Sequence, residues 1–408
     1  MENIGYLVNP WLTVAIASLV GSITLLGLRW QLGRGNWLVI GLVGAFAAGL
    51  GSTLLTAPLG YCMFQEGQKT ADMVMGWILV GLGAGLFILV SWILMSRWVQ
   101  RLPLFPRAEH VAGAFHGRFA FLNALLVLSP TLLVLIFFVY IPMFDTLRLS
   151  TLLAKFGTPR TRFVCVANFS TLLTDSGYHM NLILSFAFSG GIILLAMSSA
   201  LLIATMLNQN IRGANIYRSL LIWPYAISPV VTGAIFRLLF GQESGLINYG
   251  LDSLFGMKVA WLTTVNPARF SVIMASVWNI IGFNILFYIA GLQNIPKDVI
   301  EAAAIDGANA FQRFWRVTFP LLSPFTFFLV VTNTVYAFFD TFGLIFVLTR
   351  GGPTESTFTA MFRVYVTGIL GNDIGKATAQ SLVLFLIVVI ITIVQFRIGN
   401  RTVQYGNY

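Results

Sequence analysis

The sequence predicts an all-α integral membrane protein with about nine transmembrane helices, and two observations carry this prediction. Of the 408 residues, 57% are hydrophobic and only 9% are charged, whereas soluble domains carry about 25% charged residues. Apolar runs of about 20 residues also recur, and a helix of that length crosses the hydrocarbon core of a bilayer. Because the runs do not alternate between polar and apolar residues, we do not expect a β-barrel. The runs occupy residues 10–28, 37–59, 73–95, 120–142, 181–205, 218–240, 271–291, 323–349 and 377–397.

Basic residues indicate how these helices are oriented. The formal net charge is +10, from 24 Lys and Arg against 14 Asp and Glu. Arginines gather after the first and third runs, before the sixth, between the seventh and eighth, and after the ninth. Alternating helices place these connections on one side, which the positive-inside rule assigns to the cytoplasm. We therefore expect the N-terminus outside and the C-terminus in the cytoplasm. The basic residues are not interleaved with aromatic residues, so nucleic acid is not an expected partner.

Composition divides the chain into three parts. Residues 1–96 are predicted to form a three-helix N-terminal membrane extension, since their small residues permit close helix packing. Residues 97–119 contain two prolines and mixed charge and are expected to form a cytoplasmic or interfacial linker against lipid headgroups. Residues 120–408 hold the other six runs. The only cysteines, Cys62 and Cys165, both fall outside in this topology, where a disulfide or two unpaired thiols would be compatible.

The stretch 295–324 is too polar to cross a bilayer and predicts two helices joined by a turn. Pro296 suits a helix start, and Asp298 and Glu301 complement the positive end of the helix dipole. The alanines that follow favour a helix with a thin face, and Gly307 can adopt the left-handed conformation that ends it. Aromatic residues then recur at helical spacing, at Phe311, Phe314, Trp315 and Phe319. These features fit either an ordinary amphipathic loop or a helix that enters a groove on a soluble partner.

This stretch resembles the EAA loop of permease subunits from bacterial ABC importers. The resemblance rests on "EAA" at 301–303, "DGA" at 306–308, and on Phe314, Pro320 and Pro324. In that family the loop forms a coupling helix that is seated in a cleft of the ATPase subunit. The resemblance therefore implies that coupling to the ATPase depends on Glu301, Ala302, Ala303, Asp306, Gly307 and Ala308.

The wider chain is similar to the same family over residues 120–408, which would form the six-helix core of a type I importer of the carbohydrate family. The segments "LLIWPYAISPVVTGAIFRLLF", "LQNIP" and "LTRGGP" carry this similarity, and the C-terminal part most resembles the sn-glycerol-3-phosphate permease subgroup. The resemblance implies a bacterial inner-membrane location. It also implies a second homologous permease subunit, two ATP-binding cassette subunits and an extracytoplasmic binding protein as partners. The three N-terminal helices depart from the family pattern.

No catalytic or nucleotide-binding motif is evident in the chain. "GNDIGKAT" at 371–378 comes nearest to a Walker A loop, but Leu370 replaces its first glycine and Ala377 its Ser or Thr. We therefore expect a permease that is not an enzyme and holds no cofactor or metal, with ATP and Mg²⁺ bound by partner subunits. An ion-coupled carrier is the alternative class, but Asp340 is the only acidic residue well inside a predicted span.

Polar residues at membrane depth indicate a substrate path, since they are costly unless they face a bundle or a water-filled passage. The candidates lie on the two spans that flank 295–324, whose counterparts line the path in the family. They are Ser276, Asn279, Phe283, Asn284, Thr334, Tyr336, Phe338, Asp340 and Thr341. Polar contacts between helices would explain the same residues. For a phosphate ester, Arg237 and Arg363 are candidate cations, whereas an oligosaccharide or polyol would use the aromatic and amide groups.

Overall fold

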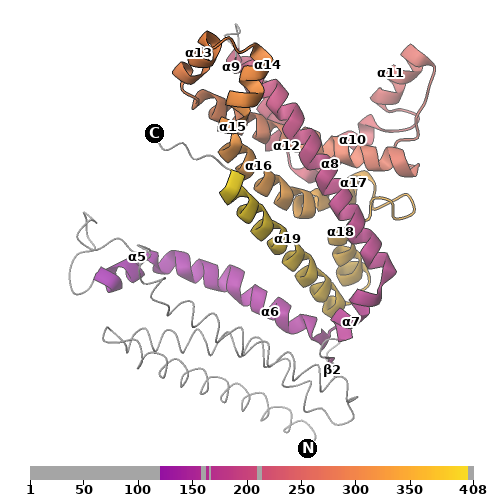
Figure 1. The fold of residues 1–408 in the computed structure, drawn as a ribbon. Coiled ribbons are helices and arrows are strands. Elements are labelled where there is room, and N and C mark those ends of the chain that lie inside the picture. The colour runs from indigo at the N-terminus through magenta and orange to yellow at the C-terminus, as the bar shows by residue number, and fades with distance from the viewer. Residues whose placement is uncertain (1–119, 158–161, 165–166, 209–213, 403–408) are drawn as a thin grey trace, which may run out of the picture. The chain divides into compact units, whose positions relative to one another are not determined.

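The computed structural model describes residues 120–157, 162–164, 167–208 and 214–402 (Figure 1). The predicted extension at 1–96, the linker at 97–119, and both cysteines lie outside the described residues. The chain divides into two compact units, Met1–Asn168 and Phe169–Tyr408. Among the described residues, the regular secondary structure is helical except for one pair of two-residue strands.

The described part of the first unit contains one long apolar helical segment. It consists of α5 (Ala120–Leu135), the π-helical η2 (Ile136–Tyr140) and α6 (Ile141–Ser150). The segment continues eight residues beyond the predicted end at residue 142, and Val127–Ser150 is long and apolar enough to cross a membrane. Two short strands follow, β1 (Leu152–Leu153) and β2 (Arg162–Phe163), which pair antiparallel.

Four long helical segments of the second unit contain predicted spans, and each is long and apolar enough to cross a membrane. They are α8 (Ser176–Leu207), α12 (Val265–Gln293), the continuous α16 (Ser323–Val335), η5 (Tyr336–Asp340) and α17 (Thr341–Leu348), and α19 (Ile374–Thr402). The helices α8 and α12 pack along each other. Fully buried Ala196 and Ala275 belong to the core between these elements, where small side chains let helices approach closely.

The predicted span at 218–240 does not form one straight helix. It consists of α9 (Ala214–Ile222), the 3₁₀ turn η3 (Trp223–Ala226) and α10 (Pro229–Leu239), with a bend of 101° between the two halves. Pro224 and Pro229 lack the N–H groups that a continuous helix needs. Proline also drives the preceding residue out of the helical region, and Ser228 is extended with ψ 142°. An apolar run that is long enough to span a membrane therefore folds as two helical halves joined by a sharp bend.

Shorter helices occupy the connections. α7 (Ala167–Thr174) precedes α8, and α11 (Leu246–Phe255) lies between α10 and α12. α18 (Ala360–Tyr365) and η6 (Val366–Leu370) lie between α17 and α19, so the connections 241–270 and 350–376 between predicted spans are partly helical. The polar stretch between α12 and α16 contains α13 (Lys297–Ile305), α14 (Ala310–Arg313), η4 (Phe314–Thr318) and α15 (Phe319–Leu321).

The two helical segments that flank this polar stretch extend from it to the other end of the unit. α12 ends at Gln293, just before α13, and its 29 residues make it about 43 Å long. The continuous segment α16–η5–α17 begins at Ser323 and ends at Leu348. Residues just before α12 and just after α17 therefore lie at the opposite end of the unit from α13.

Candidate functional site

The helix predicted after Pro296 is present as α13, and its two ends follow the sequence signals. Pro296 occupies the N-cap position, and Asp298 lies in the first turn. Gly307 has φ +80°, so it adopts the left-handed conformation expected from its position. The Gly307 N–H donates to Ala304 O, and the Ala308 N–H donates to Ala303 O, each at 3.1 Å. These two bonds form the Schellman motif that closes a helix C-terminus.

The next helix, α14, begins directly after this turn with a second cap, which was not predicted from the sequence. The Asn309 side chain accepts from the Gln312 N–H at 2.9 Å, and the Asn309 N–H donates to Gln312 Oε1 at 3.0 Å. This reciprocal pair is a capping box built from Asn and Gln. The Asn-x-x-Gln spacing was its signal in the sequence. Because the two caps adjoin, only Gly307 and Ala308 separate the closed end of α13 from the cap of α14.

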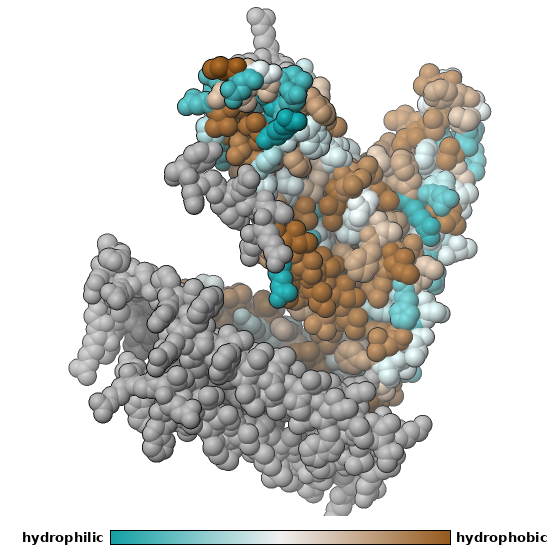
Figure 2. All heavy atoms as spheres, viewed as in Figure 1, coloured by the Kyte–Doolittle hydropathy of each residue, from teal (hydrophilic) through white to brown (hydrophobic). Residues whose placement is uncertain are grey.

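Most of the surface of α13 is exposed. None of its residues is buried, and Ile305 is 86% exposed. Phe311, on α14, is 72% exposed. Hydrophilic residues gather over α13 and α14, whereas the helices beside them are mainly hydrophobic at the surface (Figure 2). Each of these two helices thus exposes one large apolar side chain among charged residues.

Both ends of the polar stretch are anchored in one hydrophobic cluster. Ile295 and Leu322, which flank it, are 8% and 0% exposed. They belong to the same cluster as Leu292 of α12 and Leu329 of α16, and Ile300 of α13 packs against it. Because close-packed cores transmit displacement rather than absorbing it, a force on α13 acts on α12 and α16 together.

Three of the predicted path residues meet at the broken helix. Asn279 is 3% exposed, and its Nδ2 donates to Ile227 O and Thr232 Oγ1, each at 2.9 Å. Its Oδ1 accepts from the Tyr336 hydroxyl at 3.0 Å, and that hydroxyl lies 3.4 Å from Ser276 O. The Asn279 amide therefore ties α12, the break before α10, and η5 together.

Four other predicted path residues are buried in contacts within the subunit. Asn284 and Asn333 form a reciprocal amide pair between α12 and α16, at 3.2 and 2.7 Å. Thr334 Oγ1 donates to Val330 O and accepts from Gln395 Nε2 at 2.8 Å. Phe338 packs edge-on against Phe186, and Thr341 Oγ1 donates to Ala337 O. Asn284, Thr334 and Phe338 thus contact other helices, whereas the Thr341 bond lies within its own helical segment. A place for these residues in a substrate path stays a prediction.

Phe283 and Asp340 are the two predicted path residues that are not buried. Phe283 belongs to a row of aromatic rings, with Tyr225 at 5.0 Å and Phe287 at 4.7 Å between centroids. Phe287 in turn lies 4.7 Å from Phe328. Tyr225 and Phe328 are 49% and 42% exposed, so the row reaches the surface. The spacing of Phe283 and Phe287, four residues apart on one helix, was the signal for this row.

The two predicted cations differ in their surroundings. Arg363 lies 3.4 Å from the Asp175 carboxylate and 5.8 Å above the Phe358 ring, so its charge is already matched. Arg237, in the last turn of α10, is exposed and donates to Val347 O at 2.9 Å. Within the described ranges, no three His, Cys, Asp or Glu side chains gather as a metal site.

Comparison with known proteins gives a consistent result. Residues 192–403 match the family described as binding-protein-dependent transport system inner membrane component. The chain is 42% identical over 281 residues to the sn-glycerol-3-phosphate transport system permease protein UgpA of Rhizobium meliloti, covering 69% of this chain and 96% of that protein. It is 40% identical over 287 residues to the protein of the same name from Yersinia pestis, covering 70% and 96%.

Two solved structures share the fold. One is a bacterial ABC transporter involved in the import of the acidic polysaccharide alginate, with a TM-score of 0.61 and 22% identity over 70% of this chain and 97% of that chain. The other is a bacterial alginate ABC transporter in complex with an alginate pentasaccharide-bound periplasmic protein, with a TM-score of 0.62 and 22% identity over 71% and 97%.

Proposed function

The chain belongs to the family of binding-protein-dependent transport system inner membrane components, and on that premise we propose that it forms a translocation path for sn-glycerol-3-phosphate. The choice of this substrate is supported by the sequence identity of about 40% to permease proteins named for sn-glycerol-3-phosphate, over nearly their whole length. The family membership and the fold confirm the resemblance noted in the sequence and displace the alternative of an ion-coupled carrier.

The proposal includes partners that supply what this chain lacks. A second homologous permease subunit would complete the path, and two ATP-binding cassette subunits would bind ATP and Mg²⁺. The exposed helix α13 would enter a groove on one ATPase through Glu301, Ala302, Ala303, Asp306, Gly307 and Ala308. The N-terminus would lie outside and the C-terminus in the cytoplasm, since the arginines follow the positive-inside rule with α13 in the cytoplasm.

The anchoring of α13 supports a mechanism. When the ATPases close, they would displace α13, and the shared cluster around Ile295 and Leu322 would tilt α12 and α16 as a pair. Phe283 and Asp340, whose side chains are accessible, would then change their exposure to the path between the two permease subunits. The buried amide pair of Asn284 and Asn333 would hold the two helices together during this movement.

A neutral polyol or oligosaccharide is the second candidate substrate. The row of Tyr225, Phe283, Phe287 and Phe328 favours it, because aromatic faces pack well against the apolar faces of sugar rings.

One experiment separates these substrates. The purified importer is reconstituted in lipid with its binding protein, and ATP hydrolysis is measured with sn-glycerol-3-phosphate, maltose and trehalose. Stimulation by sn-glycerol-3-phosphate alone is the expected result. Stimulation by a sugar alone would keep the importer and overturn the substrate, whereas the absence of any copurifying ATPase would contradict the role of α13.

A further inference from the structure

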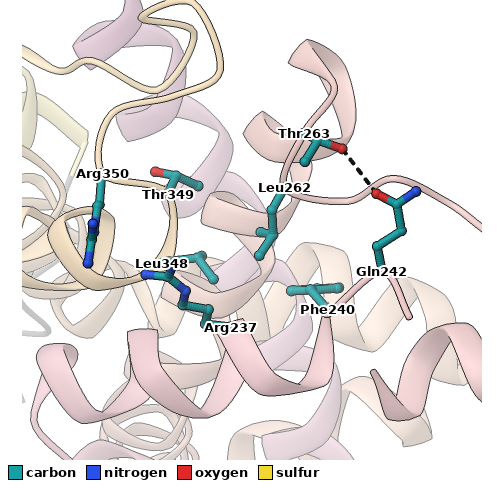
Figure 3. Close-up of a pocket in the computed structure, with 8 residues that line it drawn as sticks. All are labelled: Arg237, Phe240, Gln242, Leu262, Thr263, Leu348, Thr349 and Arg350. Carbon is teal, nitrogen blue, oxygen red and sulfur yellow. Dashed lines mark hydrogen bonds between the residues drawn. The ribbon is translucent and has the colours of Figure 1, made fainter. Parts of the chain in front are cut away.

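A pocket of about 310 Å³ lies at the end of the second unit that is opposite to α13. It is lined by residues from α10 and the residues after it, from the segment before α12, and from the end of α17 (Figure 3). They are Arg237, Phe240, Gln242, Leu262, Thr263, Leu348, Thr349 and Arg350. In the proposed topology this end faces the outside, where a binding protein would release its substrate.

The charge in this pocket is positive and unbalanced. Arg237 and Arg350 both line it, and no lining residue is acidic. Neither arginine forms an ion pair with an acidic side chain in the part of the chain that the structure describes. Figure 3 shows both arginines beside Leu348, while Gln242 and Thr263 lie together on the other side, joined by a 3.4 Å hydrogen bond. The lining thus combines two guanidinium groups with an amide and a hydroxyl.

Arg350 is held in place by an unusual turn. Its φ is +54°, in the left-handed region that favours glycine or asparagine. The Arg350 N–H donates to Ile345 O at 2.9 Å, and Thr357 Oγ1 lies 2.9 Å from Gly352 O and 2.7 Å from Thr349 Oγ1. These bonds fix the turn, so the Arg350 side chain is presented by a rigid backbone. Residues whose backbone is kept in a disfavoured conformation are often found at ligand sites.

We propose that this pocket binds the phosphate group of the substrate on its way from the binding protein into the path. This inference rests on the proposed function and assigns a binding site to its substrate. A phosphate monoester carries about −1.5 to −2 charges at neutral pH, and arginine binds phosphate through paired N–H donors. Small-molecule sites span about 300–1,000 Å³, so the pocket suits a three-carbon phosphate rather than an oligosaccharide. Gln242 and Thr263 are placed to bond the hydroxyl groups of the glycerol part.

The test uses the whole importer in proteoliposomes with its binding protein. Arg237→Gln keeps a donor for Val347 O, and Arg350→Gly removes the side chain while suiting the backbone. Arg237→Lys retains the charge. Lys258→Gln is the matched control, because it removes one charge from the same connection, outside the pocket, where Lys258 pairs with Asp252. Two quantities are measured: the maximal rate of sn-glycerol-3-phosphate uptake at saturating loaded binding protein, and the Kd for docking of that protein.

The Arg237→Gln/Arg350→Gly variant should lose at least tenfold in maximal uptake rate with an unchanged docking Kd. Arg237→Lys should lose less, and Lys258→Gln should match the wild type. If the double variant does not assemble, Arg350→Gly is tested alone, and its maximal uptake rate should fall at least threefold. Normal uptake by the variants would overturn the inference and leave the proposed function standing. A weaker docking Kd with a normal maximal rate would also overturn it, since the arginines would then bind the binding protein. No uptake by the wild type would overturn the proposed function and this inference with it.

Discussion

Replacing Gly307 by valine tests the role of α13 most directly. Gly307 has φ +80°, and an added Cβ would meet no atom within 4 Å, so the effect within this subunit is conformational rather than steric. An L-residue in the left-handed region costs about 1–2 kcal/mol, and a β-branched residue is among the least tolerant. The substitution therefore disfavours the turn that holds the Gly307 and Ala308 N–H groups on Ala304 O and Ala303 O.

A cost of 1–2 kcal/mol lowers the ratio of closed to open turn by a factor of about 5–30. If α13 transmits force only when this turn is closed, uptake by Gly307→Val should fall, by at most that factor. The variant should still insert in the membrane, because no residue of α13 is buried. Uptake and ATP hydrolysis are measured together in proteoliposomes, and the expected signature is a lower ratio of substrate transported to ATP hydrolysed.

Gly307→Asn is the matched control. Asparagine adds a side chain at the same place but adopts the left-handed conformation more readily than valine does. It should therefore retain more uptake than Gly307→Val. Equal losses in the two variants would point to a steric clash with a partner, and wild-type uptake by Gly307→Val would refute the coupling role of this turn.

Two further predictions concern helix packing, and thermal unfolding of the purified protein in detergent tests both. Gly282→Ala should destabilise by about 1–3 kcal/mol, because its Cβ would lie 2.7 Å from Leu221 O, whereas Gly250→Ala, with no atom within 4 Å, should stabilise by about 0.5–1 kcal/mol. Similar shifts in the two variants would contradict the close approach of α12 and α9. Asn284→Leu should destabilise by about 1–3 kcal/mol, because it leaves the buried Asn333 Oδ1 without the donor Asn284 Nδ2, while Asn333 Nδ2 keeps only Leu329 O. Adding Asn333→Leu should restore most of that loss, and strictly additive losses would show that the pair is not coupled.

The boundaries of α13 were predictable from the sequence because the signals that set them are local. Pro296 at the helix start and Gly307 after its end act through their own backbone, so they specify the boundaries of α13 without any distant contact. The long helices were predictable for a similar reason, since length and continuous apolarity are read along the chain. The break at 227–228 was not, because proline is tolerated inside membrane helices when neighbours satisfy the freed groups.

The candidate sites depended on contacts between distant segments. The bond from Asn279 to Ile227 O, for example, joins residues that are 52 positions apart, so the sequence around Asn279 gives no sign of it. Arg237 and Arg350 line one pocket although they are more than a hundred residues apart in the chain. The hydrogen bond from Arg237 to Val347 O likewise joins residues that are 110 positions apart. No local signal marks Arg350 as part of a pocket.

The two ends of the second unit are linked through the same pair of helices. At one end the cluster of Ile295 and Leu322 joins α12 and α16 to the stretch that contains α13. Midway, Asn279 and Tyr336 connect these helices to the break before α10. At the other end α10 and the turn after α17 supply the two arginines of the pocket. In the proposed mechanism, a displacement of α13 would reach the bent segment through the buried Asn279 amide before it reached the pocket. Asn279 would then stand at the step where movement at the α13 end changes access at the pocket end.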